Sequence, residues 1–320
     1  MKITISDVQA GQRLDKLLLE AMPTLGRAGA KRLFASGKVT LQEAGRERGR
    51  KVSKGDVGRA GDVLSVEVEP GALEGSAVPD AEAPLEVVLE TKDVLVLEKP
   101  AGQPTAPIEP GERGTLANAL VARYPELVGI GFSAREPGLC HRLDTETSGL
   151  VLAARSKEAF DILTRAIKEE RLDKRYLLVC SAKDLPESGT IEIPLAPHPK
   201  DRRRVYPCVH PRDVERYAPR PARTTWKKLE EHDGMALVEA RAGKASRHQI
   251  RAHFAAIGHP LAGDVLYGGP TVEGLGRHAL HAHWIAWGGD AKVAAFTVSS
   301  PLPGDIAGVV GKQGEGAGEG

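Results

Sequence analysis

Residues 70–84 constrain the fold most, because they interrupt the chain with a stretch that does not read as a packed element. Proline, glycine, alanine and acidic residues dominate it, and its apolar residues follow no periodicity. Such a composition is typical of a linker, and 320 residues are enough for two domains, one of them small. The sequence therefore predicts a small domain over 1–69, a linker over 70–84, a larger domain over 85–308 and a disordered tail over 309–320.

The composition is that of a globular protein, with 41% hydrophobic and 27% charged residues. The formal net charge is only +1, but positive charge is concentrated in two places. Residues 1–60 contain 13 Lys/Arg against 6 Asp/Glu, and residues 200–228 contain 10 against 3. Two such zones can form a phosphate-binding surface in a nearly neutral protein. Solvated faces without a partner would give the same counts, so charge alone leaves both interpretations open.

Cysteine usage and apolar runs indicate a cytoplasmic protein without membrane association. Cys140, Cys180 and Cys208 are widely spaced and odd in number, which argues against a disulfide framework and against a cysteine zinc site. The first residues read as a short strand rather than a signal peptide. No run approaches the roughly 18–20 apolar residues that span a bilayer.

The N-terminal region has the periodicity of a compact α/β unit. Leu14, Leu17 and Leu18 follow helical spacing, so two short helices are predicted over 13–36. Strands are predicted over 37–41 and over 62–68. Six basic residues lie along this unit: Arg13, Lys16, Arg27, Lys31, Arg32 and Lys38.

This unit resembles the alpha-L RNA-binding motif, which also occurs in a ribosomal small-subunit protein. The resemblance rests on four segments: Arg13-Leu14-Asp15-Lys16-Leu17-Leu18, Gly26-Arg27, Gly37-Lys38-Val39 and Gly61-Asp62-Val63-Leu64. The family usually has Ser-Arg at the second helix and Asn-Gly after the strand, where this chain has Gly26-Arg27 and Leu41-Gln42. The resemblance implies RNA binding by five of the basic residues: Arg13, Lys16, Arg27, Arg32 and Lys38.

The second region alternates strand and helix patterns. Strands are predicted over 86–90, 94–97, 150–154, 174–180 and 235–240, and helices over 116–121, 156–170 and 248–257. Ser156 is a candidate N-cap for the second of these helices. The Arg-rich segment 200–228 contains several prolines, so we expect it to be extended and exposed rather than helical.

A polar loop that leads directly into an apolar strand is where we expect the chemistry. Seven polar side chains fill the eight positions 141–148, Gly149 ends the run, and the apolar residues 150–154 follow. Asp144 lies two residues from Arg142, and a neighbouring guanidinium can keep a carboxylate ionised, as a nucleophile or general base requires. A solvated surface turn would have the same sequence.

Motifs in this region resemble those of the RluA-type pseudouridine synthases. Residues 141–149 match the family's His-Arg-Leu-Asp-x-x-Thr-Ser-Gly signature at every fixed position. The companions, in the family's order, are Lys99-Pro100-Ala101-Gly102, Lys174-Arg175-Tyr176, His248-Gln249-Ile250-Arg251, Gly258-His259-Pro260-Leu261-Ala262-Gly263-Asp264 and Arg277 with Leu280-His281-Ala282. The resemblance covers about residues 85–300. It implies an α+β fold: a catalytic domain with a mixed, mainly antiparallel sheet, and a small α/β N-terminal RNA-binding domain.

The resemblance implies an isomerase that converts a uridine in structured RNA to pseudouridine. The reaction breaks the bond between ribose and uracil N1, rotates the base and rejoins it through C5, without a redox step or cofactor. The lack of a dinucleotide fingerprint or P-loop is consistent with this. Asp144 would act on the ribose, and Arg251 would hold that carboxylate ionised and aimed. Tyr176 would stack on the uracil and is a candidate to take the proton from C5.

RNA contacts follow from the same resemblance. Arg142 would fill the place of the flipped nucleotide in the RNA, with a structural ion pair as its alternative role. His141 and Lys174 belong to the same motifs and are also assigned to RNA binding. The family usually reads Gly-Arg-x-His-Gln-Ile-Arg, whereas here the arginine, Arg247, directly precedes His248. This departure leaves the role of Arg247 open.

The histidines do not indicate a metal site. The side chains of His248 and His253 would point about 500° apart around a helix, and no cysteine cluster completes a zinc site. We therefore expect no metal and no other cofactor. Two other classes are weighed against the enzyme: an inactive RNA-binding or ribosome-assembly protein, and a metal-dependent hydrolase. The sequence leaves open whether large-subunit ribosomal RNA or transfer RNA is modified, and it predicts a monomer without an obligate protein partner.

Overall fold

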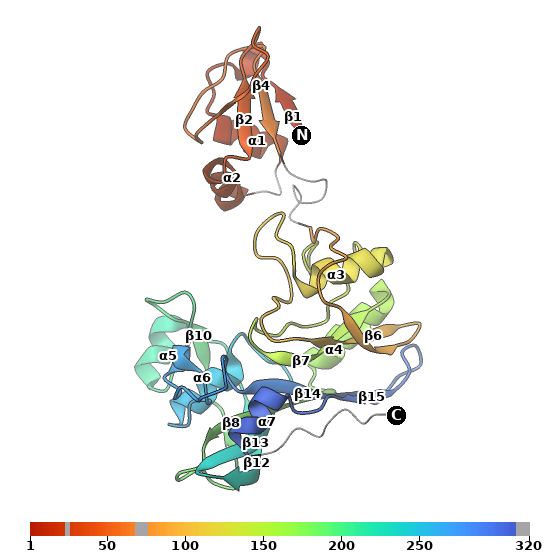
Figure 1. Cartoon of the computed structure of the whole chain (residues 1–320), viewed down its shortest axis with the longest axis vertical. Helices are drawn as coiled ribbons and strands as arrows, with labels where there is room; N and C mark the ends of the chain where they lie inside the picture. Colours follow the sequence, from red (N-terminus) through yellow and green to blue (C-terminus); the bar gives the residue numbers. More distant parts are fainter. Residues whose placement is uncertain (23–25, 68–75, 312–320) are drawn as a thin grey trace. The chain divides into compact units, whose positions relative to one another are not determined.

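The computed structural model describes residues 1–22, 26–67 and 76–311, apart from the side chains of residues 26–28 and 32 (Figure 1). The chain forms two compact units, one of residues 1–83 with 106–137 and one of residues 84–105 with 138–320. The predicted linker is described from residue 76 onward, and residues 312–320 of the predicted tail lie outside the described residues. The predicted domain limits therefore stay predictions. None of the described helices is long and apolar enough to cross a membrane.

Residues 1–67 of the first unit have the predicted α/β arrangement. Two helices, α1 (Leu14–Ala21) and α2 (Gly26–Ala35), accompany a four-stranded antiparallel sheet. The order of its strands is β1 (Lys2–Thr4), β4 (Val63–Val66), β2 (Val39–Gln42) and β3 (Arg50–Lys51). Leu14, Leu17 and Leu18 lie on one face of α1 and are buried in a single core with Val39 and Leu64. Their helical spacing is what allowed this core to be predicted.

The rest of the first unit is built around α3 (Leu116–Arg123). Thr115 Oγ1 accepts the Asn118 N–H, and Asn118 Oδ1 accepts the Thr115 N–H, which closes a capping box at the start of the helix. Asn118 Nδ2 also donates to the Val78 carbonyl at 2.7 Å. Part of the predicted linker is thus hydrogen-bonded to this helix, a long-range contact that linker composition does not reveal.

The second unit contains a nine-stranded sheet with the order β5-β6-β7-β14-β8-β13-β12-β9, and with β15 paired to β14. Its strands are β5 (Glu86–Glu90), β6 (Val94–Lys99), β7 (Ser148–Ala154), β8 (Leu172–Ser181), β9 (Ser188–Ile191), β12 (Thr224–His232), β13 (Met235–Arg241), β14 (Leu280–Trp287) and β15 (Phe296–Ser299). All neighbours pair antiparallel except β7 and β14. This confirms the predicted α+β class with a mainly antiparallel sheet.

The parallel pairing of β7 and β14 fixes the point at which the polar loop (residues 141–147) enters the sheet. Ser148 and Gly149 pair with His281 and Ala282. Gly149 has a φ of +112°, and a Cβ on it would lie 2.3 Å from the Ala282 carbonyl oxygen. Only glycine allows this backbone conformation and this close approach. The glycine of the motif therefore places the polar loop at the centre of the sheet.

Helices flank this sheet (Figure 1). Helix α4 (Lys157–Lys168) begins where predicted, because Ser156 Oγ accepts the Ala159 N–H at 3.1 Å. Helix α6 (Gln249–Ala256) packs against β11 (Val205–Pro207) and β12, and β11 pairs with β10 (Leu195–Pro197). A short helix, α7 (Gly304–Val309), follows β15.

The Arg-rich segment 200–228 contains a helix, α5 (Pro211–Tyr217), so the predicted extended conformation is wrong there. Pro211 occupies the first helical position, where its missing N–H has no partner to lose. His210 Nδ1 accepts the Arg212 N–H at 3.1 Å and caps the helix. The position of a proline in a helix, rather than the number of prolines nearby, decided the conformation.

Candidate active site

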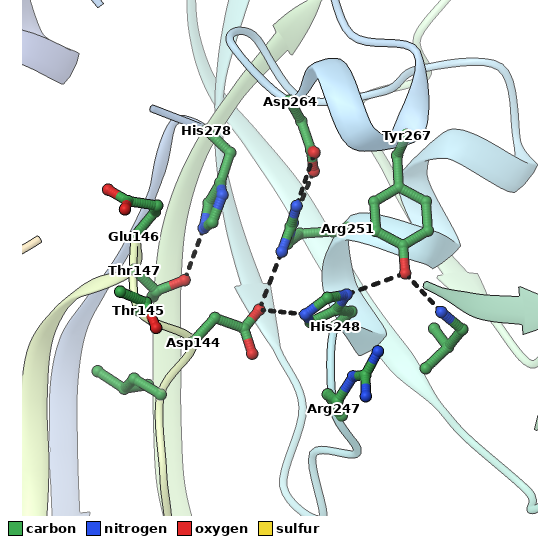
Figure 2. A network of polar contacts seen from close by, with 12 residues as sticks. Asp144, Thr145, Glu146, Thr147, Arg247, His248, Arg251, Asp264, Tyr267 and His278 are labelled. Atoms are coloured by element: carbon green, nitrogen blue, oxygen red, sulfur yellow. Dashed lines mark hydrogen bonds and ion pairs between the residues drawn. The ribbon is translucent and has the colours of Figure 1, made fainter. Parts of the chain in front are cut away.

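Asp144 lies beside a buried arginine that bridges two carboxylates (Figure 2). Arg251 Nη1 donates to Asp144 Oδ2 at 3.3 Å. The same guanidinium donates from Nε and Nη2 to the two carboxylate oxygens of Asp264, each at 2.7 Å. The shorter, bidentate contact of Arg251 is therefore with Asp264, and the longer, single contact is with Asp144.

This arrangement fixes the charge and the direction of the guanidinium. Burial by itself would lower the pKa of Arg251, but hydrogen bonds and charge from Asp264 and Asp144 outweigh it, and the pKa is raised. Buried charges are stable only when paired and hydrogen-bonded, and Asp264 supplies that pairing. Because Asp264 holds two nitrogen atoms of Arg251, the third is directed toward Asp144.

Helix α6 and the turn after it provide the pair. Arg251 lies in the first turn of α6, which begins after His248, a residue with a φ of +54°. Asp264 lies just before the short helix η5 (Val265–Tyr267). The Gly269 N–H donates to the Asp264 carbonyl at 2.8 Å, and a Cβ on Gly269 would lie 2.0 Å from the Leu261 carbonyl oxygen. The glycines predicted to form a loop therefore allow the backbone to fold tightly around Asp264.

A histidine and a tyrosine extend the network on the other side of Asp144. His248 Nε2 lies 3.7 Å from Asp144 Oδ2, and its Nδ1 lies 3.1 Å from the Tyr267 hydroxyl (Figure 2). That hydroxyl accepts the Val205 N–H at 2.8 Å, so its own hydrogen is available to His248 Nδ1. Burial lowers the pKa of His248 and favours the neutral ring. This network assigns the ring hydrogen to Nε2, which faces Asp144.

Hydrogen bonds from the end of β6 and the segment after it hold the backbone of the polar loop. Lys99 Nζ and the Gly102 N–H both donate to the Thr145 carbonyl, at 3.0 and 2.9 Å. Thr105 Oγ1 donates to the Leu143 carbonyl at 2.7 Å and accepts the Leu143 N–H at 3.2 Å. The predicted lead-in motif, residues 99–102, thus holds the residue after Asp144, and Thr105, just beyond the motif, holds the residue before it.

The segment before β14 holds the end of the polar loop. His278 Nε2 lies 2.8 Å from Thr147 Oγ1, and Arg277 Nη1 donates to the Glu146 carbonyl at 3.2 Å. Arg277 is itself held by a bidentate pair with Asp305, at 2.7 and 3.0 Å. Burial and neighbouring cations lower the pKa of His278 to about 2, so its ring is neutral. Contacts at both ends therefore preorganise the polar loop.

A small cleft opens beside Asp144. Its lining includes Arg142, Leu143, Asp144, Thr147, Tyr176 and His248. Tyr176 is buried in β8, and burial, followed by the charge of Asp144, raises the pKa of its phenol. The phenol is therefore protonated at neutral pH, which suits stacking on a base and disfavours proton abstraction by Tyr176. Arg142 is exposed, and Asp144 pairs with Arg251 rather than with Arg142.

The other residues of these motifs differ in exposure: Lys174 is buried, His141 is partly buried and Arg247 is exposed. His141 Nε2 accepts the Leu152 N–H at 3.1 Å and so ties the polar loop to β7. Lys174 lies on β8 and is buried. Arg247, whose role the sequence left open, donates to the Arg202 carbonyl at 2.7 Å and holds the Arg-rich segment.

Three of the basic residues predicted in the first unit, Arg13, Lys16 and Lys31, line one groove together with the acidic residues Asp15 and Glu20. This groove has a volume of about 770 Å³ and contains four basic side chains, those of Arg13, Lys16, Lys31 and Lys54. Arg13 donates twice to Asp15, at 2.9 and 2.8 Å, and Lys38 is exposed. The side chains of Arg27 and Arg32 lie outside the described residues.

Sequence reasoning missed Asp264, Tyr267 and Thr105 as parts of the site. Asp264 ends a recognised motif, but its role depends on a contact with Arg251 across the turn between them. An available signal was the need of a buried arginine for a buried acid, which the Gly263-Asp264 pair beside α6 could supply. Tyr267 and Thr105 carry no such signal, because their partners, which include backbone groups of Val205 and Leu143, lie in distant segments.

Comparisons with known proteins agree with this site. The family model for RNA pseudouridylate synthase matches residues 93–256. An uncharacterized RNA pseudouridine synthase of Chloroflexus aurantiacus is 35% identical over 314 residues, which cover 95% of this chain and 90% of that protein. The ribosomal large subunit pseudouridine synthase D of Nitrosomonas europaea is 30% identical, over 96% of this chain and 86% of that protein. The structure of human RNA Pseudouridylate Synthase Domain Containing 1 matches with a TM-score of 0.54 and 26% identity, over 71% of this chain and 88% of that one.

The fold and these matches define the class of the protein as an isomerase that forms pseudouridine in RNA. The chain belongs to the RNA pseudouridine synthase family, and within it to the RluA type that its motifs indicated. The predicted enzyme class is confirmed, and the two alternatives, an inactive RNA-binding protein and a metal-dependent hydrolase, are set aside.

Proposed function

We propose that Asp144 is the catalytic carboxylate and that it acts on the ribose of a uridine in large-subunit ribosomal RNA. The observation that carries this proposal is the line of contacts from Asp144 through Arg251 to Asp264. A carboxylate that reacts needs a fixed direction and a nearby positive charge, but it must keep an oxygen available. Among the described residues, Asp144 Oδ1 makes no hydrogen bond, while Oδ2 faces Arg251 and His248.

In this proposal the isomerisation takes place in the cleft beside Asp144. The bond between N1 and C1′ breaks, the uracil rotates, and C5 bonds to C1′ while its proton leaves and N1 becomes protonated. No atom is gained or lost overall. The neutral phenol of Tyr176 stacks on the uracil and keeps the detached base in the cleft.

RNA binding is assigned to the exposed and basic parts of the chain. Arg142 takes the place of the extruded nucleotide, whose extrusion costs roughly a few kcal/mol. The other predicted RNA contacts are His141, Lys174, Arg13, Lys16, Arg27, Arg32 and Lys38. Relatives from Nitrosomonas europaea and Yersinia pestis are named ribosomal large subunit pseudouridine synthase D, which supports a ribosomal rather than a transfer RNA substrate. A cytoplasmic monomer without an obligate partner is part of the same proposal.

The test compares Asp144→Asn with Glu146→Gln, which removes the other acid of the polar loop. Pseudouridines are mapped in total RNA from cells that lack the protein and are complemented with each variant. We expect the Asp144 variant to restore none of the lost pseudouridines, although its affinity for RNA stays within about threefold of wild type. We expect the Glu146 variant to restore these pseudouridines fully. Modification by the Asp144 variant would reject the catalytic assignment. If cells that lack the protein lose pseudouridines from transfer RNA alone, the assignment of ribosomal RNA as the substrate is rejected.

A further inference from the structure

Lys174 is a largely buried lysine whose ammonium pairs with none of the described residues. Only 5% of the residue is exposed, and among the described residues its ammonium makes no hydrogen bond or ion pair. Burial lowers the pKa of Lys174 to about 8. The neighbouring Cys140 offers little compensation, because burial raises the pKa of its thiol and keeps it neutral. Lys174 Nζ is not one of the fully buried side-chain atoms that lack a hydrogen-bond partner, so the ammonium reaches open space while the rest of the side chain is enclosed. A largely buried lysine whose ammonium meets no acceptor among the described residues is available to an anionic ligand.

A second hydrogen-bond donor beside Lys174 also lacks an acceptor. His141 Nε2 accepts the Leu152 N–H, so the ring hydrogen lies on Nδ1. This Nδ1 is buried and has no hydrogen-bond partner among the described residues. Burial and then the charge of Lys174 lower the pKa of His141, which places the two groups within electrostatic range of each other. His141 is thus a neutral ring and supplies no negative charge to Lys174.

Lys174 lines a cavity of about 380 Å³ at one end of β8. Four basic and two acidic residues contribute to its lining: Arg171, Lys174, Arg223, Arg241, Glu170 and Asp173. Arg171 pairs with Glu169 at 2.8 Å, and Arg223 pairs with Glu192 at 3.2 Å. These pairs are exposed and therefore weak, so the guanidinium groups can share their donors with a ligand. The cavity is thus lined by more basic than acidic side chains, and one of them is the largely buried Lys174.

We propose that this cavity binds a phosphodiester group of the RNA strand, with Lys174 as its principal contact. Lys174 and Tyr176 are two residues apart on β8, so their side chains project from the same face of the sheet. Tyr176 lines the cleft beside Asp144, so the phosphate bound by Lys174 belongs to a nucleotide close to the target uridine. The inference rests on the proposed function, and it adds a fixed anchor point for the RNA backbone.

The first experiment measures how salt affects RNA binding by the full-length protein. The probe is an unmodified transcript of large-subunit ribosomal RNA, and the variants are Lys174→Met, Lys174→Arg and Lys157→Met. Affinity for RNA falls as salt rises, and loss of one phosphate contact makes the plot of log affinity against log salt shallower by about 0.7 for single-stranded RNA. We expect this loss in Lys174→Met and recovery in Lys174→Arg. Lys157, an exposed residue of α4 that pairs with Asp161, serves as the control and leaves the slope unchanged. An unchanged slope in Lys174→Met overturns the proposal.

The second experiment tests the cavity without RNA. Thermal unfolding of the full-length protein is followed in inorganic phosphate and in chloride at equal ionic strength. Phosphate that binds the folded state raises Tm, and we expect a larger rise in wild type than in Lys174→Met. The general effect of phosphate on protein surfaces is common to both proteins and cancels in the comparison. In chloride, Lys174→Met is expected to unfold at a higher temperature than wild type, because it removes the unpaired charge.

The two experiments separate this inference from the proposed substrate. Equal phosphate responses of wild type and Lys174→Met overturn the site, whatever happens with RNA. A phosphate response that depends on Lys174, in a protein that leaves the transcript unmodified, upholds the site and rejects the substrate. A lower Tm of Lys174→Met in chloride indicates that the lysine stabilises the fold, and this result also overturns the proposal.

Discussion

Replacing Asp264 with asparagine tests whether a buried carboxylate directs Arg251 toward Asp144. The Asp264 side chain is 1% exposed and accepts two hydrogen bonds of 2.7 Å. Asparagine at position 264 is neutral, so the buried guanidinium of Arg251 keeps one charged partner in the described site, Asp144 at 3.3 Å. Removing one partner of a buried pair costs about 3–5 kcal/mol. Because Asp144 can compensate in part, we expect a loss of about 3 kcal/mol in the free energy of unfolding.

The same substitution should reduce activity by a separate route. Without Asp264, the guanidinium of Arg251 is free to pair closely with Asp144, which makes that carboxylate a poorer nucleophile or base. Contacts with the RNA backbone are unchanged. We therefore expect kcat to fall by at least about tenfold while KM stays within a factor of about two, the pattern of an interaction that acts mainly in the transition state.

Urea unfolding monitored by tryptophan fluorescence measures the stability change in the relevant unit. The three tryptophans all lie in the second unit: Trp226, Trp284 and Trp287. Asp305→Asn is the matched control, because Asp305 makes the same bidentate contact with Arg277 but is 35% exposed. Solvent screens this second pair, so its loss should cost only about 1 kcal/mol. Equal losses in the two variants, or an Asp264 variant with full activity, would refute the reasoning.

Three further predictions concern the polar loop, the sheet and Lys174. Thr105→Val removes a buried hydroxyl that makes two hydrogen bonds to the polar loop; we expect a loss of about 2 kcal/mol in urea unfolding and a lower kcat. Gly149→Ala places a Cβ 2.3 Å from a backbone oxygen of β14 at a φ of +112°, so soluble expression and Tm should both fall sharply. Burial lowers the folded-state pKa of Lys174 from 10.5 to about 8, so between these values the unfolded chain binds the extra proton and rising pH favours folding. The stability advantage expected for Lys174→Met should therefore shrink from pH 8 to pH 10.5, and a constant difference in urea unfolding would contradict the buried charge.

Local patterns predicted seven elements of the second unit: β5, β6, β7, β8, β13, α4 and α6. The apolar stripe and serine cap of α4 and the paired strands β5 and β6 depend on residues close in sequence, so their signals survive without tertiary information. Helix α5 was missed for three reasons: it is too short to show a clear periodicity, its first-turn proline resembles a helix breaker, and histidine is not a usual N-cap residue. The hydrogen bonds of residues 77–80 were missed for a different reason, since their partners lie on α3 and nearby loops.

By itself, the sequence indicated the class of enzyme, the α+β fold and the candidate residues Asp144, Tyr176 and Arg251, because its motifs carry the resemblance to a known family. Only the tertiary structure decided how they act together. Asp144 and Arg251 are 107 residues apart. The parallel pairing at Gly149 places the loop that carries Asp144, and Asp264 holds Arg251 through a turn that no periodicity predicts. The unpaired charge of Lys174 is also a tertiary property. Burial and the lack of a partner depend on every segment that packs around a residue, and no single segment of the sequence specifies them.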